Sequence, residues 1–216
     1  LISIRLVRLF TVLFIIVGFI STGLRRLILL ASAFWLFILG SCLGSFLGCM
    51  GYRIPNKIST LYPRSYCEHC KKTLKWYMNI PILSYILLDG KCKYCHKKIG
   101  IIYFLTEIIT ALLFVFNYFM FGFNINFFIS IILSCILTVT IVSDFEYYYI
   151  SDRVLLIGYI LLLGVLYYFD KDILFTNVVS SIVIFLVMYG IKILGNSMFK
   201  KESLGDGDIK LMGVIA

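Results

Sequence analysis

The sequence predicts an all-α polytopic membrane protein that carries a small cytoplasmic zinc-binding loop domain. Three observations support this fold class. The 216 residues are 61% hydrophobic and 14% charged, whereas soluble domains contain about 25% charged residues. Several apolar runs approach or exceed the roughly 20 residues that a membrane-spanning helix needs. The one sizeable polar region, Tyr52–Lys98, contains two Cys-x-x-Cys pairs and all three prolines.

The distribution of charge argues against a nucleic-acid-binding protein, although the net charge is +9. Ten of the 20 Lys and Arg residues lie in Arg53–Lys98, where only Glu68 and Asp89 oppose them. A basic loop between apolar spans is typical of the cytoplasmic face of a membrane protein. We therefore expect the lipid bilayer as a partner of this chain, and no nucleic acid.

The beginning of the chain contains two apolar segments. Residues 1–26 hold a short apolar run with arginines on both sides, which is typical of an anchor or an uncleaved signal-like stretch and does not indicate an orientation. Residues 27–51 form the first expected transmembrane helix. Gly40, Gly44 and Gly48 recur in it at four-residue spacing, and this pattern predicts close packing against another helix.

We expect residues 52–98 to form the zinc-binding domain and residues 99–216 to form the remaining transmembrane domain, which carries both acidic clusters described below. Its expected spans are Gly100–Phe121, Phe127–Val142, Val154–Phe169 and Ile173–Leu194. Glu107 lies inside the first of them and indicates pairing within the bundle, because a buried charge is costly. A polar loop, Gly195–Ser203, precedes the final apolar run. Ile209–Ala216 supplies eight residues of that run, so we expect the domain to be C-terminally incomplete.

The paired cysteines predict a metal site. Each Cys-x-x-Cys pair supplies two thiolates from one tight turn, and a reducing compartment favours metal over disulfides. Four thiolates complete a tetrahedral zinc site of the structural kind, with no position left for water. The adjacent His69 and His96 could replace a thiolate, but we expect them to be solvated neighbours. The expected ligands, with 21 residues between the pairs, are Cys67, Cys70, Cys92 and Cys95.

Two acidic clusters lie at the ends of apolar runs, where ionisable groups indicate function. Asp144 follows one run, and Asp208 in Gly205-Asp206-Gly207-Asp208 precedes another. If the basic loop is cytoplasmic, counting spans places both clusters on that same side. A single aspartate there would be read as a loop acid. Two aspartates that meet at one membrane boundary instead indicate an aspartyl protease dyad, in which the two carboxyl groups share a proton.

Several segments occur in a characteristic order from Gly44 to the end, over about four-fifths of the chain. Besides the cysteine pairs, they are Gly44–Pro55, Trp76–Tyr85, Tyr103–Glu107, Ser143–Asp152 and Gly205–Lys210. Their combination resembles the bacterial type IV prepilin peptidases, a family of GxGD aspartyl intramembrane proteases. Two positions depart from the family pattern. Ile150-Ser151-Asp152 stands where Leu-Pro-Asp is frequent, and Gly48 stands where Asn is frequent.

The resemblance implies a peptidase in the bacterial cytoplasmic membrane that cleaves the leader of type IV prepilins or pseudopilins at the cytoplasmic face. Type IV pilus assembly, protein secretion and competence are the processes it would serve. The resemblance assigns the catalytic carboxylates to Asp144 and Asp208. It also implies S-adenosylmethionine-dependent N-methylation of the new N-terminus, for which the sequence shows no nucleotide-binding loop.

The sequence leaves two other interpretations open. Another GxGD intramembrane protease, such as a preflagellin or presenilin-like peptidase, would use the same aspartates, but the paired-cysteine loop argues against it. A non-enzymatic zinc-bearing membrane scaffold or transporter is the second. In that protein Asp144 and Asp208 would be dispensable for peptide cleavage.

Overall fold

The computed structural model describes residues 2–60, 62, 64–169, 171–199 and 204–216. Helices make up the regular structure of these residues, together with two isolated β-bridges. The elements in chain order are α1 (Ile2–Arg53), the short 3-10 helix η1 (Trp76–Asn79), α2 (Leu83–Leu87), α3 (Ile101–Phe121), α4 (Ile125–Tyr147), α5 (Asp152–Phe169), α6 (Lys171–Phe199) and α7 (Asp206–Ile215).

The expectation of an all-α polytopic membrane protein is confirmed. Five helical stretches are long and apolar enough to cross a bilayer: Leu24–Arg53, Ile101–Phe121, Ile125–Tyr147, Asp152–Phe169 and Ile173–Met198. Most of their surface is exposed, as helices that face lipid require. The structure shows α1 as one continuous helix from Ile2, so no turn marks the boundary expected at residue 26.

Two helices extend further at their C-terminal ends than the sequence predicts. Helix α4 continues five residues past Val142, until Tyr148 adopts a left-handed conformation (φ 50°, ψ 40°) and ends it. Helix α6 extends to Phe199 through part of the loop expected at Gly195–Ser203; residues 200–203 of that loop lie outside the described residues. In both places polar residues continue the helical hydrogen bonding, and a hydropathy count stops too early.

The packing of α1 against α3 depends on the three glycines of α1, and this prediction is confirmed. A Cβ atom on Gly40 would lie 2.8 Å from the Cα of Ala111, and one on Gly44 would lie 2.9 Å from the Cα of Glu107. On Gly48 it would lie 2.8 Å from the Thr106 Oγ1. Small residues therefore allow the two backbones to approach closely.

We expect Gly44→Ala to destabilise this interface. The added methyl group would meet the main chain of α3, which cannot move aside as a flexible side chain can, and overpacking of this kind costs about 1–3 kcal/mol. Thermal unfolding in detergent should show a lower midpoint. Gly164→Ala is the matched control, because no atom lies within 4 Å of a Cβ placed on this helical glycine. Equal midpoints for the two variants would contradict the packing argument.

Helices α3, α4 and α5 are joined by polar and apolar contacts. Asn117 donates to the Ser134 Oγ over 3.1 Å, which links α3 to α4 inside the bundle. Between α4 and α5, Ile136 packs with Leu155 and Leu162 in the buried core. Interhelical hydrogen bonds of this kind help to hold membrane helices together.

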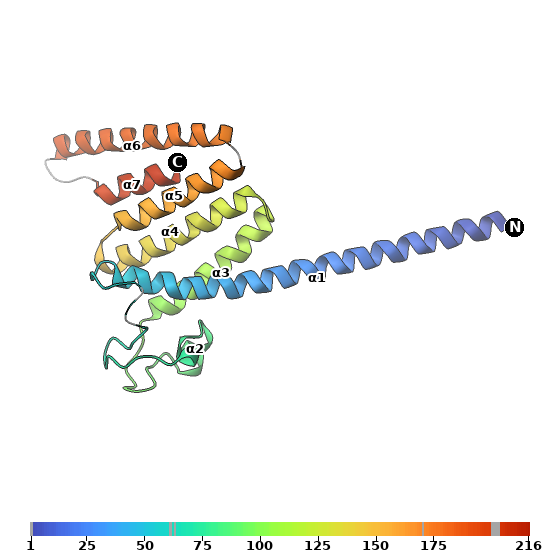
Figure 1. The fold of residues 1–216 in the computed structure, drawn as a ribbon, viewed down its shortest axis with the longest axis horizontal. Coiled ribbons are helices and arrows are strands. Elements are labelled where there is room, and N and C mark those ends of the chain that lie inside the picture. The colour runs from blue at the N-terminus through green and yellow to red at the C-terminus, as the bar shows by residue number, and fades with distance from the viewer. Residues whose placement is uncertain (1, 61, 63, 170, 200–203) are drawn as a thin grey trace.

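The helices lie side by side, with α7 between α5 and α6 (Figure 1). The C-terminal end of α4 and the N-terminal ends of α5 and α7 are at one end of the bundle, where the last turns of α1 also lie (Figure 1). The cysteine-containing segment, residues 54–100, projects beside α1 and α3 near this end. Both acidic motifs are therefore at the same end of the bundle, as counting the spans predicts.

Candidate active site and metal centre

The Gly-Asp-Gly-Asp motif forms the start of α7. Gly205 is the N-cap residue in an extended conformation (φ −68°, ψ 142°), and the helix begins at Asp206. Both aspartates lie in the first turn of the helix. Both carboxyl groups therefore lie at the positive end of the helix dipole.

At each glycine of the motif, a larger side chain would collide with a neighbouring group. A Cβ on Gly205 would lie 2.9 Å from the Oδ2 of Asp208, so the carboxylate folds back over the N-cap residue. A Cβ on Gly207 would lie 2.6 Å from the Cβ of Ile150. Glycine at these positions therefore allows the Asp208 side chain and the connection between α4 and α5 to pack against the first turn of α7.

Asp144 lies in the last turn of α4, with an exposed side chain. Its carbonyl oxygen accepts a hydrogen bond of 2.9 Å from the main-chain N–H of Tyr148, the residue that ends the helix. The chain then reaches Ile150, which contacts Gly207 of α7. The connection that follows Asp144 is thus packed directly on the turn that carries Asp208.

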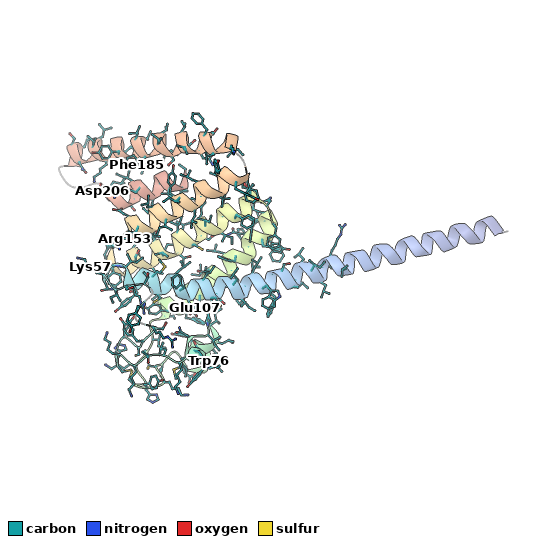
Figure 2. All side chains as sticks on the ribbon, viewed as in Figure 1. Lys57, Trp76, Glu107, Arg153, Phe185 and Asp206 are labelled. Carbon is teal, nitrogen blue, oxygen red and sulfur yellow. The ribbon has the colours of Figure 1, made fainter. Side chains whose placement is uncertain are left out.

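The two other aspartates at this end form ion pairs. Asp152, at the start of α5, accepts from the Lys210 Nζ over 2.7 Å, and Asp206 pairs with Lys192 of α6. The hydrogen bond from Lys192 and its positive charge lower the pKa of Asp206. Asp206 lies in the first turn of α7, at the end of the helix that Figure 2 labels, and its side chain is exposed. Within the described part of the chain, Asp144 and Asp208 have no Lys or Arg ion-pair partner.

The four paired cysteines come together as the sequence predicts. The sulfur atoms of Cys67, Cys70, Cys92 and Cys95 lie within 4.8 Å of one another, and all seven cysteines of the chain are free. Tetrahedral zinc with Zn–S bonds of about 2.3 Å places its sulfur ligands about 3.8 Å apart. The Sγ atoms of Cys67 and Cys95 are 3.8 Å apart. His69 and His96 are exposed and do not belong to this group.

The two cysteine pairs have the same local structure. In each, the first cysteine accepts a main-chain hydrogen bond from the residue four positions later, and that residue has positive φ: Lys71 (57°) and His96 (56°). An antiparallel bridge closes each turn: Tyr66 with Thr73, and Lys91 with Lys98. Two equivalent turns thus present two sulfur atoms each, which is the arrangement that a four-thiolate zinc site requires.

The buried thiols of the cluster have shifted pKa values. Burial raises the pKa of the Cys67 thiol to about 11. Burial acts in the same direction on Cys92, but hydrogen bonds from the main-chain N–H groups of Cys95 and Tyr94 and from neighbouring thiols lower its pKa to about 7. Zinc binds thiolates and displaces their protons, so a bound ion would replace the protons that this cluster otherwise shares.

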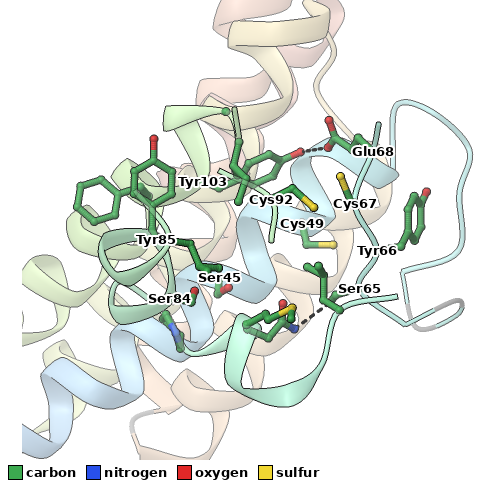
Figure 3. A pocket seen from close by; sticks show the side chains of 18 of the residues that line it. Ser45, Cys49, Ser65, Tyr66, Cys67, Glu68, Ser84, Tyr85, Cys92 and Tyr103 are labelled. Carbon is green, nitrogen blue, oxygen red and sulfur yellow. Dashed lines mark hydrogen bonds between the residues drawn. The ribbon is translucent and has the colours of Figure 1, made fainter. Parts of the chain in front are cut away.

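A cavity of about 770 Å³ lies between the cysteine-containing segment, α1 and α3. Figure 3 shows part of its lining, including Ser45 of α1, Tyr85 of α2 and Glu68 beside the cysteine cluster. The Tyr103 hydroxyl of α3 donates to the Glu68 Oε1 over 2.5 Å and so ties the cluster to the bundle. No motif in the sequence indicates this cavity.

Glu107 also lines the cavity, and it has one partner inside the helix bundle and one outside it. The Ser45 side chain of α1 hydrogen-bonds its carboxylate, as expected for pairing within the bundle. Its Oε2 also accepts a 2.6 Å hydrogen bond from the main-chain N–H of Ile82 in the cysteine-containing segment. Ile82 has positive φ (62°) at the start of α2. The donor lies 25 residues earlier in the chain, and the sequence carries no signal for a main-chain partner at that distance.

Comparisons with known proteins give a consistent result. Family models of the bacterial peptidase A24 N-terminal domain and of the type IV leader peptidase family match residues 38–121 and 131–216. The chain is 33% identical over 180 residues to a prepilin leader peptidase/N-methyltransferase of Bacillus subtilis, covering 83% of this chain and 71% of that protein. No solved structure gives a significant match.

Two further relatives carry the same name. A Vibrio cholerae protein is 30% identical over 188 residues, which cover 82% of this chain and 74% of the relative. A Myxococcus xanthus protein is 30% identical over 183 residues, which cover 85% of this chain. In the last case the chain spans only 55% of the relative's length.

Proposed function

Because this chain belongs to the type IV leader peptidase family, we propose that it cleaves the leader of type IV prepilins or pseudopilins with a dyad of Asp144 and Asp208. One observation carries the assignment of the dyad. The first turn of α7, which holds Asp208, packs through Gly207 on the connection that follows Asp144. The ion pairs of the neighbouring aspartates also favour this choice, because Asp206 pairs with Lys192 and Asp152 pairs with Lys210.

The mechanism follows from two carboxyl groups that share one proton. The ionised carboxylate takes a proton from a water molecule, whose oxygen forms a bond to the scissile carbonyl carbon. The protonated carboxyl group donates a hydrogen bond to the carbonyl oxygen and polarises it. When the peptide C–N bond breaks, a proton passes to the leaving amine. Both carboxyl groups lie at a helix terminus of the bundle, which suits a substrate whose cleavage point adjoins a hydrophobic segment.

We place this end of the bundle and the cysteine-containing segment on the cytoplasmic side of a bacterial cytoplasmic membrane. Ten Lys and Arg residues lie in Arg53–Lys98, and positive charge is typical of cytoplasmic loops. Arg153 and Lys57 lie at this same end (Figure 2). A positively charged segment would repel a basic leader, so its role in this proposal is structural and lipid-facing.

Co-expression with a prepilin tests the peptidase. The pilin should become smaller on a gel, and its N-terminal mass should correspond to loss of the leader. A scaffold or transporter would leave the prepilin at full length. A pilin that is never shortened by the wild-type protein would contradict the proposed function.

Methyl transfer is a second candidate function, and the cavity is the observation that favours it. The names of the relatives include N-methyltransferase. A volume of about 770 Å³ lies within the range of roughly 300–1,000 Å³ for small-molecule sites. Its lining offers the aromatic face of Tyr85 and two carboxylates, Glu68 and Glu107, which suit a base, ribose hydroxyls and an amine. When bound there, S-adenosylmethionine would supply the methyl group.

The two activities should be separable. We expect Asp144→Asn and Asp208→Asn to retain methylation of a pilin supplied in cleaved form, because methyl transfer to an amine does not need the dyad. Mass spectrometry of the pilin N-terminus measures the added methyl group. Loss of methylation in both variants would indicate that a single site performs both reactions.

A variant that fills the cavity, compared with a control on the opposite face of α2, tests the position of the methyl-transfer site. Ser84 lines the cavity, whereas Leu83 beside it is exposed. Ser84→Phe should abolish methylation and leave cleavage in place, because the new ring occupies the cavity. Leu83→Phe adds a ring on the opposite face of α2 and should preserve both activities. Equal methylation by the two variants would exclude this cavity.

A further inference from the structure

The turn around α2 has two different faces. Pro81, Ser84, Tyr85 and Leu88 line the cavity. The other face carries Leu83, Ile86 and Leu87, which are 56%, 57% and 81% exposed. In a segment of five helical residues, three large aliphatic side chains therefore have no cover from the described parts of the chain.

This segment lies beside a membrane-spanning helix, not beyond its end. The main-chain N–H of Ile82 bonds to the carboxylate of Glu107, the seventh residue of α3. At 1.5 Å per residue, Glu107 is about 9 Å along the helix from its first residue. The Tyr85 ring also stacks on Phe104 of α3, with 4.7 Å between the ring centroids. The exposed face of α2 is thus at the depth of the first turns of a span, Ile101–Phe121.

An exposed indole lies at the rim of the cavity, next to α2. Trp76 in η1 is 80% exposed and also lines the cavity, and η1 packs against α2. Tryptophan favours the boundary between acyl chains and headgroups, where its ring is apolar and its N–H stays polar. Exposed lysines, including Lys75 and Lys91, accompany these residues. Lysine can reach the headgroup region and attracts anionic lipids.

We propose that Trp76 and the exposed face of α2 (Leu83, Ile86, Leu87) form a lipid-facing wedge, embedded at the headgroup boundary of the leaflet next to the cysteine-containing segment. The occupant of this surface is bilayer lipid. The Ile82–Glu107 hydrogen bond and the Tyr85–Phe104 stack hold the turn against α3, and the exposed lysines Lys75 and Lys91 complement anionic headgroups. The opposite face of the same turn lines the cavity, so the wedge holds the cavity at the level of the membrane surface.

Fluorescence quenching tests the wedge directly. The chain contains two tryptophans, so Trp35→Phe leaves Trp76 as the single reporter. In phosphatidylcholine/phosphatidylglycerol vesicles, acyl chains brominated near the headgroup should quench Trp76 strongly, and chains brominated near the terminal methyl should quench it less. Soluble acrylamide should have little effect. Trp76→Phe is the control, in which Trp35 reports from within the first span. Full accessibility of Trp76 to acrylamide without quenching by brominated lipid would overturn the proposal.

A second pair of variants tests the role of the α2 face. In the Trp35→Phe background, Leu87→Asp should reduce brominated-lipid quenching of Trp76 at least two-fold, because a carboxylate is expelled from the acyl boundary. Leu87→Met should retain the quenching. The zinc content of each purified variant shows whether the cysteine-containing segment is folded. Unchanged quenching in a zinc-loaded Leu87→Asp protein would show that α2 does not enter the bilayer.

Discussion

Replacing Asp144 or Asp208 by asparagine is expected to abolish leader cleavage. An amide has nearly the shape of a carboxylate, but it can neither take a proton from water nor return one to the leaving amine. The loss of one partner in proton transfer costs about 10²–10⁴-fold or more. Cleavage of a prepilin by variants expressed at equal levels measures the effect. Processing at the wild-type rate by either variant would refute the dyad.

Asp206→Asn and Asp152→Asn are the matched controls. They alter acids in the same motifs, but these acids are engaged by Lys192 and Lys210. Exposed ion pairs contribute about 0–1 kcal/mol, so both controls should fold and keep measurable activity. Complete inactivity of a folded Asp206→Asn protein would instead place that residue in the reaction.

The second large effect concerns zinc. We expect one zinc ion per chain, and we expect Cys67→Ser/Cys92→Ser to lose it, because the double substitution removes one ligand from each turn. Structural zinc contributes about 10–16 kcal/mol of apparent binding free energy, and the cysteine-containing segment should unfold without it. Metal analysis of purified protein is the measurement. Since both cysteines also line the cavity, methyl transfer should be lost together with the metal.

Cys135→Ser is the control for this experiment. Cys135 lies in α4 and is not a member of the four-sulfur group, so its replacement should leave the zinc content unchanged. A wild-type protein without zinc, or a double variant that still contains it, would refute the metal site.

The membrane spans could be predicted because hydropathy reflects a solvent preference that is local in the sequence. The C-terminal ends of α4 and α6 could not be predicted in this way, because Ser143–Tyr147 and Gly195–Phe199 are helical without being uniformly apolar. The cluster of four cysteines could be predicted for a similar reason. A Cys-x-x-Cys pair defines its own turn, and only the meeting of the two pairs needs the tertiary fold.

Contacts between residues far apart in the chain were not predictable. The bonds from Ile82 to Glu107 and from Lys210 to Asp152 join residues 25 and 58 positions apart. Helical periodicity relates residues three or four positions apart and carries no information about such pairs. In the same way, only the structure identifies Ile150 as the neighbour of Gly207.

A cross-linking measurement tests most directly whether the ends of α4 and α7 form one active site. Asp144→Cys and Asp208→Cys are combined in a protein in which Cys42, Cys49 and Cys135 are alanine and the zinc ligands are kept. The protein in vesicles is treated with a short bifunctional maleimide and its peptides are analysed by mass spectrometry. Gly122→Cys with Asp208→Cys is the control. Gly122 follows the C-terminal end of α3, which lies at the opposite end of the bundle from the start of α7 (Figure 1). The dyad predicts one linker joining positions 144 and 208 within a chain, and none in the control. Separate modification of the two cysteines, with no linked peptide, would contradict it.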